Sequence, residues 1–379
     1  MTVSGTCAPQ FQELHDLLDA SIDAGEDLGA SIALIHDGEM VVDIWGGWAD
    51  PERTRPWERD TIVNVWSTTK TVTSLAALIL IDRGLLDVDA PVAKYWPEFA
   101  ANGKENVLVR HVMSHTSGVA GWEAPVTVED LYDPIAAARR LESQAPWWEP
   151  GTAIGYHGIS VGTLVAELIR RIDGRSLHAF VAEEIAGPLG ADFHIGLDPV
   201  HDSRVATIVP PPAAEIDLDA LDKDSALYKF MVGPTMDPSR ANDPNWRRAQ
   251  FGAANGHGNA RSVARVQSVV SHGGEIDGVR LLSPATCELT LREQLTGVDI
   301  FLGFPVRWGI GYALAADGTF CFGAPPGRMC CWGGWGGSVL LNDLDHGFTF
   351  AYMMNKMAPE IAGSARSEAL VHAVYRAMK

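Results

Sequence analysis

A serine and a lysine stand three residues apart in the stretch VWSTTK, residues 65–70. Residues at this spacing lie on one face of a helix with Cβ atoms roughly 5–6 Å apart, so the nitrogen of Lys70 can reach the hydroxyl of Ser67. Burial and the positive end of the helix dipole would favour a serine alkoxide and lower the pKa of the amine. The pair therefore has the chemistry of a nucleophile and its general base.

A helix cap is the simpler interpretation of the same serine. The segment after Trp66 is apolar as far as Asp82 and ends at Arg83-Gly84, which predicts a buried helix that begins near Ser67. Serine is a frequent helix cap, and an isolated S-x-x-K pattern is short. The spacing by itself leaves both interpretations open.

The two ends of the chain predict one antiparallel sheet with a helix beside each end. Residues 11–25 have apolar positions at helical spacing, and residues 29–50 predict two strands joined at Asp37-Gly38, a strong hairpin sequence. Near the C-terminus the pattern predicts a strand, a strand pair around 345–347 and a closing helix, in residues 308–315, 337–356 and 364–379.

The middle of the chain is mostly helical in pattern, so the predicted fold class is α+β: an antiparallel sheet flanked by helices, plus a mostly helical lobe. We expect a single domain over residues 1–379. Its α/β lobe would comprise about 1–89 and 285–379, and its helical lobe about 90–284. The acidic, proline-bearing segment 210–225 is the most loop-like part, and we expect it to be exposed.

Charge and composition exclude several classes of partner. The chain has 379 residues, of which 46% are hydrophobic, and 29 Lys and Arg stand against 48 Asp and Glu, a formal charge of -19. Such a charge repels phosphate backbones and anionic lipids, so we expect neither nucleic acid nor membrane as a partner. We find no signal-peptide pattern and no apolar run of about 20 residues, and we expect a cytoplasmic protein. The oligomeric state stays open.

Cysteine and histidine spacing gives no indication of a metal site. The five cysteines are an odd number without C-x-x-C spacing, and Cys330 and Cys331 are adjacent, so we expect small apolar fillers. The histidines lack H-E-x-x-H or comparable spacing. We expect no metal and no cofactor.

Three further segments accompany VWSTTK in a fixed order: VRHVMSHTSGV (109–119), GTAIGYHGISVGTLVAELI (151–169) and CCWGGWGGSVLL (330–341). Together they resemble the serine β-lactamase-like superfamily, which includes class C β-lactamases and DD-peptidases, and specifically its esterase branch, the family VIII carboxylesterases. The resemblance covers most of the chain. It implies a β-lactamase-like fold and a serine hydrolase that forms an acyl-enzyme.

The resemblance also implies roles for individual residues. Ser67 would be the acylated nucleophile, and Lys70 and Tyr156, hydrogen-bonded to each other, its base system. Trp332-Gly333-Gly334 would occupy the position of the K-T-G strand at the edge of the substrate site. The backbone N–H groups of Ser67 and Trp335 would bind the oxyanion.

Two departures from the family pattern affect the expected substrate. Gly158 stands where an asparagine follows the tyrosine in β-lactamases, and Trp332 replaces the lysine of K-T-G, so recognition of an acyl amide and of a carboxylate is lost. We expect small neutral carboxylic esters as substrates. Gly333 and Gly334 would let the substrate approach the strand closely because they have no Cβ.

Other possibilities remain open. The stretch GISVG, residues 158–162, fits the nucleophile elbow G-x-S-x-G, but Ser160 has no strand before it and begins an apolar helix, so we expect a packing role. An amide or β-lactam hydrolase, or an acyltransferase, on the same scaffold is the alternative function, and a binding protein is a third. The role of His157 is undecided. Some of Trp122, Trp147, Trp148, Trp246 and Trp335 could line the cleft.

Overall fold

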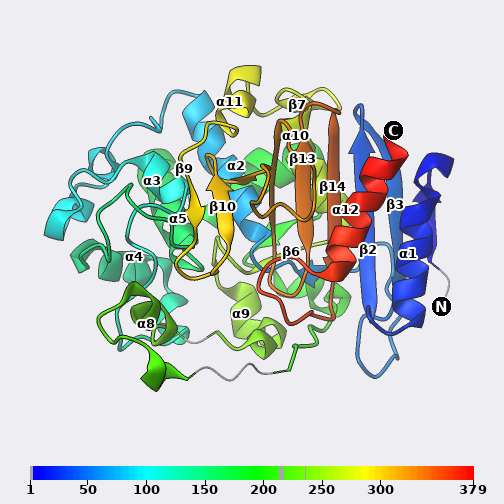
Figure 1. Ribbon diagram of the computed structural model, residues 1–379, viewed down its shortest axis with the longest axis horizontal. Coiled ribbons are helices and arrows are strands. Elements are labelled where there is room, and N and C mark those ends of the chain that lie inside the picture. The colour runs from blue at the N-terminus through cyan, green and yellow to red at the C-terminus, as the bar shows by residue number, and fades with distance from the viewer. Residues whose placement is uncertain (1–2, 213–216, 235) are drawn as a thin grey trace.

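Nine strands of the described residues form one antiparallel sheet, and they come from the two ends of the chain (Figure 1). The computed structural model describes residues 3–212, 217–234 and 236–379. The strand order across the sheet is β1-β3-β2-β14-β13-β12-β11-β10-β9. Their bounds are Ser4–Cys7 (β1), Gly29–His36 (β2), Glu39–Gly47 (β3), Leu295–Val298 (β9), Pro305–Trp308 (β10), Ala313–Leu314 (β11), Met329–Gly333 (β12), Val339–Asp343 (β13) and Phe348–Met354 (β14).

The N-terminal hairpin forms as the sequence predicts. Asp37 and Gly38 have φ of 50° and 82°, and the strands pair from His36 opposite Glu39 onward. Positive φ at both central residues gives the turn a twist that matches that of the flanking strands. β14 pairs with β2, which joins the C-terminal hairpin to the N-terminal one in the centre of the sheet.

Helices cover both faces of the central strands. Helix α1 (Gln12–Asp23) packs against α12 (Ala365–Ala377), and Figure 1 shows both in front of the sheet. Helix α10 (Ala260–Ser271) packs on β2, β13 and β14. Every residue of β14 is buried, which requires cover on both faces. The expected α+β class, with helices flanking an antiparallel sheet, is confirmed.

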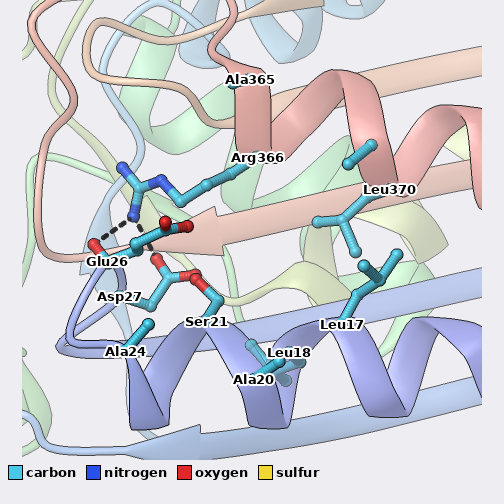
Figure 2. A pocket seen from close by; sticks show the side chains of 11 residues that line it. Leu17, Leu18, Ala20, Ser21, Ala24, Glu26, Asp27, Ala365, Arg366 and Leu370 are labelled. Atoms are coloured by element: carbon cyan, nitrogen blue, oxygen red, sulfur yellow. Dashed lines mark hydrogen bonds and ion pairs between the residues drawn. The ribbon is translucent and has the colours of Figure 1, made fainter.

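Between α1 and α12 lies a cavity of about 330 Å³ (Figure 2). At one end of it, Arg366 donates to the carboxylate of Asp27 at 2.5 Å and to the carbonyl of Glu26 at 2.8 Å. The hydroxyl of Ser21 donates to the other carboxylate oxygen of Asp27 at 2.7 Å. These bonds hold the ends of the two terminal helices together.

The middle of the chain is mostly helical and lies beside the sheet (Figure 1). Helix α2 (Thr69–Asp82) is buried from Thr69 to Leu80 and packs against α5 (Ser160–Asp173), which ends at Gly174 with φ of 90°. The other α-helices are α3 (Val109–Met113), α4 (Pro134–Ser143), α6 (Leu177–Val181), α7 (Gly187–Leu189), α8 (Ala226–Met231), α9 (Pro244–Arg248) and α11 (Pro284–Leu289). No helix of the described residues combines the length and the apolar character needed to cross a bilayer.

Two short sheets complete the described fold. β4 (Val63–Asn64) and β5 (His194–Ile195) both pair with β6 (Gly256–Gly258). β7 (Glu275–Ile276) pairs with β8 (Val279–Arg280). The first of these sheets holds the chain just before the Ser67 turn.

Some details differ from the expectations. The strand predicted over 308–315 is two strands, because Gly311 has φ of 83° and its N–H donates to the carbonyl of Met113 at 2.9 Å. Within 210–225, residues 213–216 lie outside the described part, and 217–220 are exposed. The division into lobes at about 89 and 285 stays a prediction, and α10, from the middle segment, packs on the sheet.

Candidate active site

The turn that carries Ser67 lies between β4 and α2 and is held in a strained conformation. Trp66 has φ of 48°, in the left-handed region that bulky residues rarely adopt. Val65 donates to the carbonyl of Gly256 at 2.9 Å, and the hydroxyl of Thr69 donates to the carbonyl of Trp66 at 2.5 Å. Such strain persists only where surrounding bonds enforce it, and it is common at functional residues.

The side chain of Lys70 ends among three oxygen atoms. Its Nζ lies 2.9 Å from Ser67 Oγ, 2.7 Å from the carbonyl of Gly158 and 2.9 Å from the carbonyl of Ala253. A neutral amine has two N–H groups and one lone pair. The two carbonyls can only accept, so in the neutral form they take both N–H groups and leave the lone pair for the Ser67 hydroxyl.

The surroundings of Lys70 favour this neutral form. The residue is 4% exposed, and burial holds the pKa of its amine well below the usual value. No carboxylate of the described residues forms an ion pair with it. The amine can therefore receive the proton of Ser67 as a general base.

Tyr156 lines the same cavity as Ser67. The indole Nε1 of Trp332 donates to its phenolic oxygen at 3.0 Å. Burial raises the pKa of Tyr156 well above its ordinary value, so the phenol is neutral. Because the indole can only donate, the O–H of Tyr156 is free to point at Ser67.

Lys70 and Tyr156 meet without the direct hydrogen bond that we expected. Lys70 Nζ lies over the tyrosine ring, 4.7 Å from its centroid. Gly158 and Ala253 take the amine's remaining bonds, and Trp332 takes the phenolic oxygen. Lys70 and Tyr156 therefore approach each other at Ser67 without a hydrogen bond between them.

Two backbone N–H groups are available for an oxyanion. Among the described residues, neither the amide of Ser67 nor that of Trp335 donates to another group, whereas the neighbouring amide of Gly336 donates to the carbonyl of Glu360. Ser67 and Trp335 line the same cavity. A pair of unpaired N–H groups beside a nucleophile is the arrangement of an oxyanion hole.

That cavity has a volume of about 340 Å³, and the described residues that line it carry no charge. Among these described residues the polar side chains are the two hydroxyls of Ser67 and Tyr156, and the others are apolar or glycine: Trp66, Ala120, Gly121, Trp122, Trp147, Gly158, Ile159, Phe230, Met231, Gly233, Pro234, Met236, Ala254, Trp335 and Ile361. A ligand carrying a charge would lose its hydration there without a compensating partner.

The segment Trp332-Gly333-Gly334 lies behind the site rather than along the cavity. Trp332 is 2% exposed, and none of the three lines the cavity. The glycines are required by the chain's own packing: a Cβ at Gly334 would lie 2.4 Å from the carbonyl of Val65, and one at Gly333 2.2 Å from that of Ser338. Trp332 donates to Tyr156 instead, and a contact of this segment with substrate stays a prediction.

His157 is part of the framework. Its Nδ1 lies 2.6 Å from the carbonyl of Gly155, and its Nε2 lies 2.6 Å from the hydroxyl of Ser117. A carbonyl can only accept, so Nδ1 carries the proton and Nε2 accepts from Ser117. Burial lowers the pKa of His157 to about 4, which keeps the ring neutral. The ring fixes the segment before α5 rather than touching the cavity.

Ser160 has no access to the cavity. It is fully buried at the start of α5, and its hydroxyl donates to the carbonyl of Val119 at 2.8 Å. No strand precedes it in residues 153–159. The nucleophile elbow of GISVG is therefore absent.

The sequence identified only some of the residues that build the site. Trp122, Trp147 and Trp335 line the cavity, as the sequence suggested. Trp66 and Phe230 also line it, and the sequence did not indicate either of them. The carbonyls that hold Lys70 belong to the backbone. Every residue has a backbone carbonyl, so the amino-acid sequence does not show which of them will accept these hydrogen bonds. Within the described residues, no group of three or more potential metal ligands comes together.

Residues 16–374 match the Beta-lactamase family. Esterase/beta-lactamase LipL of Mycobacterium tuberculosis is 35% identical over 342 residues, which cover 87% of this chain and 77% of LipL. Esterase EstB of Burkholderia gladioli is 28% identical over 390 residues, which cover 96% and 94% of the two chains. A crystal structure of a family VIII carboxylesterase superposes over 100% of both chains, with a TM-score of 0.92 and 38% identity. The chain therefore belongs to the beta-lactamase family, in the branch of the family VIII carboxylesterases.

Proposed function

We propose that this serine hydrolase cleaves small neutral carboxylic esters through an acyl intermediate on Ser67. The observation that carries the proposal is the position of Lys70, whose Nζ lies 2.9 Å from Ser67 Oγ and 2.7 and 2.9 Å from the carbonyls of Gly158 and Ala253. The printed names of LipL, EstB and the family VIII carboxylesterase agree with an ester as substrate. The uncharged cavity favours a neutral one.

The residues divide the reaction among them. Lys70 takes the proton of Ser67 as Oγ attacks the ester carbonyl, and the N–H groups of Ser67 and Trp335 stabilise the oxyanion. Tyr156 gives its proton to the departing alkoxide, which leaves as the alcohol. Lys70 keeps the proton that it took from Ser67 and Tyr156 remains as the phenolate, so that no net proton is gained or lost during acylation.

Water completes the cycle from the same positions. The phenolate of Tyr156 removes a proton from a water molecule that attacks the acyl carbon. The serine oxygen leaves with the proton held by Lys70, and the carboxylic acid departs. Once ionised, its carboxylate finds no positive side chain among the described residues that line the cavity, which favours its release.

A fluorophosphonate that labels serine nucleophiles tests the proposal. The adduct is expected on Ser67, and Ser67→Ala should abolish both labelling and hydrolysis of p-nitrophenyl acetate. Ser160→Ala is the matched control and should keep turnover. Labelling of Ser160, or hydrolysis that survives Ser67→Ala, would overturn the assignment. A chromogenic cephalosporin and a linear amide assayed alongside separate esterase from lactamase or amidase activity.

A further inference from the structure

The backbone conformation of Gly158 does not require a glycine, but a neighbouring side chain leaves little space for a Cβ at this position. Its φ is not positive, so an ordinary residue could adopt the same conformation. A Cβ built on it would meet one neighbour within 4 Å, the ring of Phe230, at 3.3 Å from Cζ and 3.4 Å from Cε2. A side chain at position 158 would thus press against the ring of Phe230, which would have to shift by a few tenths of an ångström.

Both partners are held by contacts of their own. The carbonyl of Gly158 accepts a hydrogen bond from Lys70 at 2.7 Å, which ties this backbone to the base. Phe230, on α8, stacks on Phe301 with ring centroids 4.4 Å apart and planes 13° apart. Phe301 in turn is fixed because its N–H donates to Asp299 at 2.9 Å. Because residue 158 has no side chain, the ring of Phe230 can take up this position beside it.

This ring is part of the cavity wall. Phe230 lines the cavity together with Trp122 and Trp147, and the ring of Trp147 lies edge-on to Phe301 at 6.4 Å. Aromatic side chains bind another ring in stacked or edge-to-face geometry more strongly than they bind an aliphatic group of equal size. The wall beside Gly158 thus has the composition of a binding site for a planar ring.

We propose that Phe230, admitted by Gly158, is a specificity residue that gives the site a preference for esters carrying an uncharged aryl group. This inference rests on the proposed ester hydrolysis at Ser67 and adds the chemical class of the substituent. The ring can belong to the acyl or the alcohol part, because both pass through the cavity that Ser67 and Phe230 share.

Matched pairs of esters test the preference. Methyl phenylacetate against methyl cyclohexylacetate varies the acyl ring with a constant alcohol, and benzyl acetate against cyclohexylmethyl acetate varies the alcohol ring with a constant acyl group. In at least one pair the phenyl member should have a kcat/KM roughly 2- to 10-fold higher, the size of an aromatic pair contact.

Three variants assign the preference to the residue pair. Phe230→Leu should bring the phenyl-to-cyclohexyl ratio close to one. Gly158→Asn should lower the ratio as well, because its Cβ displaces the ring, and in the Phe230→Leu background it should cause no further fall in the ratio. Phe304→Leu is the matched control, since Phe304 is half-buried, contacts the ring of Phe320 in a tilted geometry at 5.2 Å and does not line the cavity.

Binding without turnover separates this inference from the proposed function. In Ser67→Ala, calorimetry with phenylacetone and cyclohexylacetone should show the same preference for the phenyl ligand. If that preference is present while no ester is hydrolysed by the wild type, the aryl site stands and the esterase proposal fails. A ratio near one in both ester pairs and in binding, or a ratio that Phe230→Leu leaves unchanged, overturns the aryl site.

Discussion

The indole Nε1 of Trp332 lies 3.0 Å from the phenolic oxygen of Tyr156, and both side chains are buried. Since an indole only donates, the phenolic oxygen of Tyr156 accepts from Trp332, and its O–H remains free to donate to another group. The tryptophan thus orients the phenol and is placed to stabilise a phenolate after the proton leaves.

Loss of the indole donor should slow turnover more than it weakens binding. In Trp332→Phe the phenolate loses one hydrogen bond, and we expect kcat for p-nitrophenyl acetate to fall roughly 10-fold, the worth of a bond to a charged acceptor. KM should change little, because Trp332 does not line the cavity. Steady-state kinetics measures both quantities.

Trp308→Phe is the control for this prediction. Trp308 is equally buried and stacks on Tyr156 at 6.4 Å, but its Nε1 has no hydrogen-bond partner among the described residues. Replacing Trp308 by phenylalanine removes an indole N–H without breaking a hydrogen bond. Equal kcat values for the two variants would show that the bond to Tyr156 has no catalytic role.

The lysine must be able to lose its proton for the reaction to begin. Lys70→Arg keeps a long cationic side chain but cannot act as a base, so we expect a fall in kcat/KM of about 10²–10⁴-fold. The kcat/KM of Lys70→Ala should fall by a similar factor. An arginine variant close to wild-type rates would contradict the role of Lys70 as the base.

The rate should depend on pH through the same group. The pKa of Lys70 is lowered by burial, and the reactive form is the neutral amine. Activity is therefore lost as the pH falls through this lowered pKa and present above it, well below the range where a free lysine deprotonates. A pH profile of kcat/KM measures the midpoint, and a midpoint at the ordinary lysine pKa would contradict the assignment.

Stability should also fall in acid because of buried histidines. Burial lowers the pKa of His157 to about 4 and that of His257 to about 3, whereas the unfolded chain has a value of about 6.5. Between these limits the unfolded state binds more protons, so each histidine lowers the free energy of unfolding by about 1.4 kcal/mol per pH unit as the pH falls.

Urea unfolding at pH 7, 6 and 5 measures this slope. His257→Asn removes one titrating group and should make the slope shallower by about 1.4 kcal/mol per pH unit at most. The same slope in wild type and variant would show that His257 is not held neutral by burial.

Substrate charge should affect the rate strongly. A neutral methyl ester should be hydrolysed with a much higher kcat/KM than the corresponding monoester of a dicarboxylic acid, because the described part of the cavity lining offers no charged partner. Trp332→Lys should not make the carboxylate substrate acceptable. It would bury an ammonium group against Tyr156, and we expect loss of turnover with both substrates. Comparable rates for the two esters in the wild type would contradict the neutral-ester proposal.

The sequence determined the parts of the fold that depend on local pattern. The hairpin at Asp37-Gly38, the buried helix after Ser67 and the closing helix from Ser364 follow from turn residues, apolar runs and caps. The pairing of Ser67 with Lys70 follows in the same way, since their spacing in one turn brings them to 2.9 Å. Local geometry is repeated wherever the same residues occur, and this makes it predictable.

Only the tertiary structure decided what surrounds the pair. The carbonyls of Gly158 and Ala253, the indole donor of Trp332 and the ring of Phe230 come from segments between 88 and 262 residues away from Lys70 in the chain, and they meet it only after the sheet and the helices have packed. The amino-acid sequence does not show which backbone carbonyls accept hydrogen bonds. It also does not show whether an indole lines a cavity or donates to a tyrosine, because its chemistry suits both roles. Which of these it does depends on distances between distant segments, and those distances are set by packing of the whole core.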